Sequence, residues 1–78
     1  MINAYVVAGV EAGKDEEVLR KARKIRGVKQ AVSAYGNYDL YIEVAFDTME
    51  ELDRFVFDDI RMLDGIKETV TIIASGET

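Results

Sequence analysis

Two runs with alternating apolar residues meet at Gly36-Asn37, and this pattern most restricts what the chain can fold into. A Gly-Asn pair between two period-2 runs predicts a tight β-hairpin whose first central residue takes a positive φ. We expect residues 28–35 to pair with residues 38–46. One face of the second strand is apolar: Leu40, Ile42, Val44 and Phe46. The other face is too apolar for a solvated surface and too polar for a core, which suits a partner or a ligand.

The segments on either side predict two helices and two more strands. Residues 2–9 have the character of a strand, and residues 14–25 have helical spacing with acidic residues first and basic residues last, as the helix dipole favours. A capping box at Thr48 to Glu51 begins a second helix that stops at Gly65. Residues 66–74 form a last strand, and 75–78 are a polar tail. The apolar stripes of the two helices are Val18, Leu19, Ala22 and Ile25, and Met49, Leu52, Val56, Ile60 and Leu63.

A faint internal repeat organises these elements. Residues 27–32 match residues 65–70 in position and character, and each copy follows a helix and opens a strand. Right-handed crossovers of two βαβ halves then predict a ferredoxin-like α+β fold of order β-α-β-β-α-β, with a four-stranded antiparallel sheet and both helices on one face.

Composition narrows the class of protein. We expect residues 1–78 to form a single domain in the cytoplasm, because the chain has no Cys and no apolar run or leader that would place it in a membrane. The lack of Cys and His excludes disulfides and thiolate or imidazole metal sites, so no metal or cofactor is expected. A net charge of −5 argues against nucleic acid as a partner. Self-association is the remaining means of stabilising so small a core.

The sheet face without helices has the composition of an interface. Taking alternate residues, it would carry Tyr5, Val7, Ala31, Ser33, Tyr35, Asp39, Tyr41, Glu43, Thr69, Thr71 and Ile73. Tyr enrichment with few charges is typical of interface cores. We expect a two-fold dimer through this face, with Tyr5, Val7, Ser33, Tyr35, Tyr41 and Ile73 at the contact, although a bulge would flip part of the set. Phe57 lies off its helix's apolar stripe and hints at a further contact surface.

The sequence offers few residues that could catalyse a reaction. His and Cys are absent, adjacent Asp58 and Asp59 would point in different directions on a helix, and no phosphate-binding loop exists. The strand that stacks bases in RNA-recognition modules of this topology is acidic here. Two interpretations of Asp39 are open. Its carboxylate could accept a local hydrogen bond from the turn backbone, or it could hold a ligand's ammonium group beside the N–H groups of Asn37 and Tyr38. Hydroxyls of Thr69 and Thr71 could add to such a site.

Three segments resemble the effector-binding (RAM) domain of the Lrp/AsnC transcription regulators. Gly36-Asn37-Tyr38-Asp39-Leu40 is similar to that family's G-x-Y-D-hydrophobic hairpin, residues 65–71 to its G-V-x-x-T-x-T closing strand, and Gly27-Val28 to the start of its second strand. The resemblance spans nearly all of residues 2–74. The family's N-terminal helix-turn-helix has no counterpart before Ile2, so we expect a stand-alone effector domain that does not bind DNA by itself.

The resemblance implies a function and its residues. It implies dimers through face-to-face sheets, rings of dimers such as octamers, and a free amino acid as effector near the hairpin, with Gly36, Asn37, Tyr38, Asp39, Thr69 and Thr71 as binding candidates. Co-assembly with full-length Lrp/AsnC-type regulators would follow. Two alternatives share the fold: a dimeric α/β-barrel enzyme of the small monooxygenase type, which usually places His, Trp or Asn in the barrel, and an ACT-like amino-acid-binding module. The absence of His and Trp, the hairpin and the T-x-T strand favour the non-enzymatic sensor.

Overall fold

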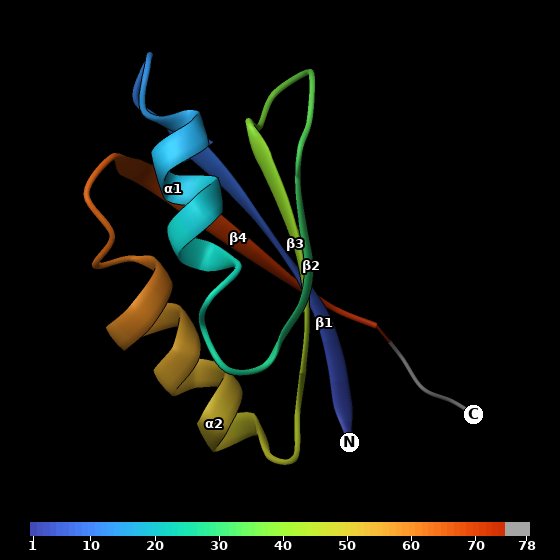
Figure 1. Ribbon diagram of the computed structural model, residues 1–78. Coiled ribbons are helices and arrows are strands. Elements are labelled where there is room, and N and C mark those ends of the chain that lie inside the picture. Colours follow the sequence, from blue (N-terminus) through green and yellow to red (C-terminus); the bar gives the residue numbers. More distant parts are fainter. Residues whose placement is uncertain (75–78) are drawn as a thin grey trace.

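In the computed structural model, which describes residues 1–74, the strands and helical segments follow the order that the sequence predicts (Figure 1). In chain order the elements are β1 (Ile2–Val10), α1 (Asp15–Ala22), β2 (Val28–Ser33), β3 (Leu40–Phe46), α2 (Met49–Arg54), η1 (Phe55–Ile60) and β4 (Ile66–Ile73). The polar tail predicted at 75–78 lies outside the described residues.

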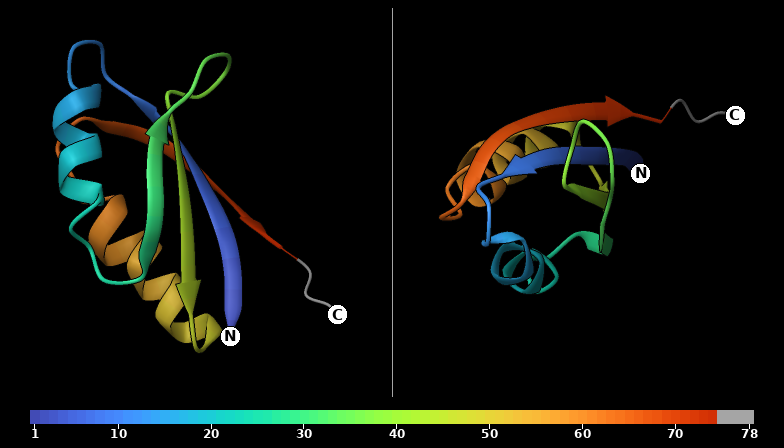
Figure 2. Two further views of the ribbon diagram at one scale, coloured as in Figure 1. Left: turned by 45° about the vertical axis from the view of Figure 1, so that its right-hand side comes forward. Right: turned by 90° about the horizontal axis from the view of Figure 1, so that it is seen from above.

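The four strands form one antiparallel sheet in the order β2-β3-β1-β4. The helical segments cover one face of this sheet, and no element of residues 1–74 covers the other (Figure 2). This arrangement confirms the predicted ferredoxin-like fold. It leaves β2 and β4 as edge strands and one broad sheet face open to a partner.

Helix α1 is shorter than the predicted 14–25. Its first turn holds Asp15, Glu16 and Glu17, and its last turn holds Arg20 and Lys21, which complements the helix dipole at both ends. The helix ends at Ala22 and the chain then turns through residues 23–27. Gly27 completes that turn with φ +97°.

Helix α2 begins at a capping box that differs slightly from the expected one. The Thr48 hydroxyl accepts a hydrogen bond from the Glu51 N–H at 3.1 Å, and the Glu51 carboxylate accepts one from the N–H of Asp47, not Thr48, at 3.0 Å. The helix continues into η1, whose π-type turns bring both Phe55 and Val56 into the core. The prediction that Met49 packs inward is wrong, since 43% of its surface is exposed.

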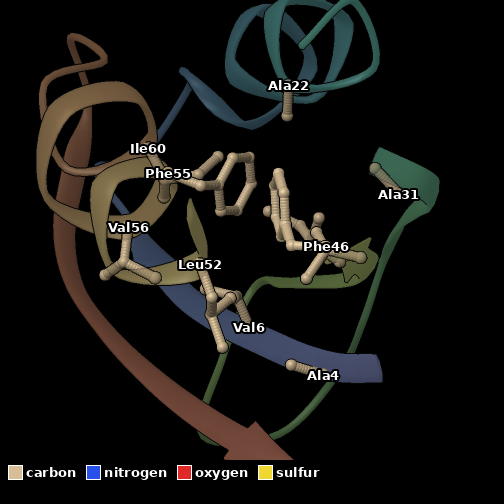
Figure 3. Close-up of a cluster of buried hydrophobic side chains, with 11 residues drawn as sticks. Ala4, Val6, Ala22, Ala31, Phe46, Leu52, Phe55, Val56 and Ile60 are labelled. Carbon is tan, nitrogen blue, oxygen red and sulfur yellow. The ribbon is translucent and has the colours of Figure 1, made fainter. Parts of the chain in front are cut away.

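The core lies between the helices and the covered sheet face (Figure 3). At its centre the rings of Phe46 and Phe55 are tilted against each other with centroids 5.2 Å apart. The Phe46 ring also lies directly against Gly27, where an added Cβ would come within 2.3 Å of the ring. A glycine is therefore required at position 27 by both the turn and the close approach of this ring.

Candidate functional site

The uncovered sheet face is built from two rows of side chains that run across all four strands. The strand registers place Val32, Tyr41, Val7 and Val70 in one row and Gln30, Glu43, Tyr5 and Ile72 in the next. The rings of Tyr5 and Tyr41 stack with centroids 5.3 Å apart. Exposed fractions of 40% for Tyr41, 41% for Val70 and 51% for Ile72 show how much apolar surface this face leaves open.

This register corrects part of the predicted face. Tyr5, Val7, Tyr41 and Glu43 lie on it as predicted. Five residues lie instead on the side of the sheet that faces the helices: Ala31, Ser33, Thr69, Thr71 and Ile73. Ala31 is buried in the core, and Tyr35 lies in the hairpin loop with its side chain fully exposed.

Two bulges cause the correction. One interrupts β2 between Val28 and Gln30, and the other lies where Val10 pairs with Ile66 and Gly9 with Glu68. Each bulge inserts one extra residue, Lys29 or Lys67, and so reverses the face of every residue that follows it in the strand. The residues of this face that the sequence analysis missed are Val32, Val70 and Ile72. Because Ile72 and Ile73 are both apolar, the sequence of β4 alone does not show which of them lies on the uncovered face.

The hairpin loop is wider than the predicted two-residue turn. Strand β2 ends at Ser33 and β3 begins at Leu40, and the Ala34 N–H donates to the Asp39 carbonyl at 2.8 Å across the base of the loop. Gly36 has φ +109°, as predicted for its position. The loop thus presents Gly36, Asn37 and Tyr38 beyond the end of the sheet.

Asp39 ties this loop to the end of β1. Its Oδ2 accepts a hydrogen bond from the buried Val10 N–H at 2.7 Å, and its own N–H donates to the Ala8 carbonyl at 2.8 Å. These bonds extend the β1–β3 ladder past Leu40, with a side chain standing in for a backbone acceptor at the bulge. The interpretation of Asp39 as a local hydrogen bond to the turn backbone is therefore wrong, because its carboxylate is bound by the N–H of Val10 in β1, 29 residues away.

The hairpin loop and the two threonines occupy different strands of one subunit. Ala8 pairs with Leu40 on one side and with Thr69 on the other, so β1 separates the loop from β4. Two strand spacings correspond to about 10 Å. Thr69 and Thr71 are half-buried on the edge strand. The structure therefore does not bring the six predicted binding residues into one contact group within a subunit.

One ion pair joins the two βαβ halves at the same end of the sheet. Lys14 Nζ lies 2.7 Å from Asp64 Oδ2 at the surface. The hydrogen bond and the charge of Lys14 lower the pKa of Asp64, and Asp64 in turn raises the pKa of Lys14. Within residues 1–74, no three potential metal-ligating side chains come together, and no helix is long and apolar enough to cross a membrane.

Comparison with known proteins gives one consistent family. Residues 3–78 match the family described as the Lrp/AsnC ligand binding domain. An HTH-type transcriptional regulator of Pyrococcus furiosus is 32% identical over 72 residues, which cover 92% of this chain and 49% of that protein. The chain thus spans about half the length of the curated relatives it matches.

Solved structures share the fold closely. The crystal structure of FFRP-DM1 is 39% identical and superposes with a TM-score of 0.92, covering 96% of this chain and 100% of that one. A transcriptional regulator of Neisseria meningitidis in complex with L-Met is 20% identical with a TM-score of 0.87, covering 97% of this chain and 51% of that one. The latter likeness shows the fold alone.

Proposed function

Because the chain belongs to the Lrp/AsnC ligand-binding domain family, we propose that it is a self-associating sensor of a free amino acid that modulates transcription regulators and is not an enzyme. The relatives named above are regulators, and one structural neighbour holds L-Met. The absence of His and Cys from the chain removes the commonest general base and the commonest thiol nucleophile, which supports the non-enzymatic assignment.

The proposed self-association is supported mainly by the uncovered sheet face. It presents stacked Tyr5 and Tyr41 beside Val7, Val70 and Ile72, and a contiguous apolar surface of this kind marks an interaction site. A second copy of the same face is the simplest cover, because a two-fold dimer needs only self-complementarity. The family resemblance extends this dimer to rings of dimers such as octamers.

Assembly also explains how separated residues can serve one ligand. The hairpin loop with Gly36 to Asp39 and the edge strand with Thr69 and Thr71 lie at the same end of the sheet but on opposite sides of β1. We place the amino acid between subunits, where the loop of one could approach the edge strand of another. Full-length regulators of the family would offer the same surfaces for co-assembly.

A thermal-shift screen of the twenty amino acids tests the sensing function. A ligand that binds only the folded protein stabilises it by RT ln(1 + [L]/Kd), or about 2.7 kcal/mol at a hundredfold excess over Kd. We expect one amino acid, or a chemically related few, to raise Tm with saturation, while the D-enantiomers do not. A uniform lack of response at millimolar concentrations would reduce the domain to an assembly module.

A further inference from the structure

Of the described residues that make up the two rows of the uncovered sheet face, Glu43 alone carries a charge. In the strand register it lies between Gln30 of β2 and Tyr5 of β1. Its side chain is 30% exposed, so its neighbours already withdraw much of it from water within one subunit. A carboxylate at this position conflicts with covering the face, because burying a charge without a partner is strongly unfavourable.

The bulge in β2 supplies the partner of this carboxylate. Val28 and Gln30 pair with consecutive residues of β3, so Lys29 between them has no partner of its own in that strand. Bulges re-aim side chains. Lys29 Nζ lies 3.7 Å from Glu43 Oε2. An inserted residue of an edge strand thus brings an ammonium group to a carboxylate on an inner strand.

The value of this ion pair depends on whether the face is covered. In one subunit the Lys29 side chain is 54% exposed, and exposed ion pairs contribute little to stability. When a second molecule excludes water from the face, the attraction between unlike charges strengthens and an unpaired Glu43 becomes costly. The pair therefore matters mainly for assembly.

We propose that the β2 bulge places Lys29 to neutralise Glu43 when two copies of this chain close face to face, so that Lys29 is a determinant of self-association. A second copy fits because each face brings its own counter-charge to the contact. Without Lys29, a two-fold contact would repeat the unpaired carboxylate on both sides. The inference rests on the proposed self-association and names a residue that controls it.

The two residues of the pair have unequal roles, which gives the inference a distinctive signature. Lys29→Gln leaves an unpaired carboxylate on a short side chain of the inner strand β3. Glu43→Gln leaves an ammonium group on a long, flexible side chain of the edge strand β2, which can turn to water. Lys29→Gln should therefore harm assembly while Glu43→Gln should not.

Subunit exchange between isotopically labelled and unlabelled protein, followed by native mass spectrometry, tests the inference. Mixed dimers should form at least ~10-fold faster in Lys29→Gln than in the wild type, because tenfold corresponds to only about 1.4 kcal/mol and each dimer buries two unpaired carboxylates. Glu43→Gln should exchange no faster than the wild type, and adding it to Lys29→Gln should restore slow exchange. The matched control is Lys24→Gln, an exposed cation in the turn after α1, which should exchange like the wild type.

Far-UV circular dichroism establishes that each variant is folded, and the exchange rates then decide. If Lys29→Gln exchanges as slowly as the wild type, the inference is overturned and the proposed self-association stands. The inference also fails if Glu43→Gln accelerates exchange as much as Lys29→Gln, or if the double variant remains as fast as Lys29→Gln, because the unpaired Glu43 would then not be the cause. A wild type that is a folded monomer would refute both the inference and the proposed self-association.

Discussion

Replacing Asp39 by alanine should loosen the hairpin loop from the sheet and destabilise the whole domain. The substitution removes the acceptor of the Val10 N–H, a bond of 2.7 Å between a carboxylate and a backbone amide. Val10 is only 6% exposed, so water does not readily replace the lost partner. The two backbone bonds that Asp39 makes, to Ala8 and from Ala34, remain available to alanine.

The size of the loss follows from the type of bond. Hydrogen bonds to charged groups contribute about 1.5–3 kcal/mol, and an unsatisfied buried donor costs about 1–3 kcal/mol. We therefore expect the unfolding free energy to fall by about 2 kcal/mol. For a domain of this size each kcal/mol corresponds to roughly 4–8 °C in Tm, so Tm should drop by on the order of 10 °C.

Urea denaturation at a fixed protein concentration measures the loss, and hydrogen exchange locates it. The Val10 amide should exchange faster in Asp39→Ala, while Asp39→Asn, which keeps a carbonyl acceptor, should retain most of the protection. Asp53→Ala removes an exposed helical carboxylate and should stay within about 0.5 kcal/mol of the wild type. If Asp39→Ala is as stable as Asp53→Ala and the Val10 amide keeps its protection, the carboxylate does not hold the loop.

Two further predictions concern the turns that frame the helices. Gly27→Ala should lower the unfolding free energy, measured by urea denaturation, by about 2–5 kcal/mol, because it combines a left-handed φ with a clash between the new Cβ and the Phe46 ring. Gly13→Ala should lower it by only about 1–2 kcal/mol, because Gly13 has φ +85° but open space around it. If both variants lose the same unfolding free energy, the clash with Phe46 does not contribute. At pH values above 3.8, the ordinary pKa of the carboxyl group, Asp64→Asn should have a lower Tm than the wild type, because pairing with Lys14 lowers the pKa of Asp64 in the folded state. The difference should vanish as pH falls through the folded pKa and Asp64 becomes protonated; a difference that persists in acid would contradict the ion pair's role.

Strand alternation was sufficient to assign faces where a strand is regular. Strands β1 and β3 pair with each other without a bulge, so side chains alternate between the two faces along both strands, and the predicted faces of Tyr5, Val7 and Tyr41 agree with the structure. In β2 and β4 a single inserted residue, Lys29 or Lys67, reverses the phase. A bulge depends on how two strands of separate origin pair, and no local residue preference in the sequence marks it.

In the candidate site, too, features set by local sequence could be predicted, whereas contacts between distant segments could not. The loop at Gly36 follows from turn chemistry, because glycine alone tolerates its φ of +109° at little cost. The partner of Asp39 could not be predicted, since Val10 lies 29 residues away and the bond exists only once β1 lies beside the hairpin.

Light scattering of the wild type and of Tyr41→Lys tests most directly whether the uncovered sheet face is an interface. The wild type should have a mass of at least twice the 8.7 kDa of one chain at micromolar concentration. Tyr41→Lys should shift it toward a folded monomer, because burying an unpaired ammonium costs several kcal/mol. Ser33→Lys, on the other side of the sheet, should leave the assembly intact. A wild-type protein that stays a folded monomer, or a Tyr41→Lys variant that assembles like the wild type, would contradict the account.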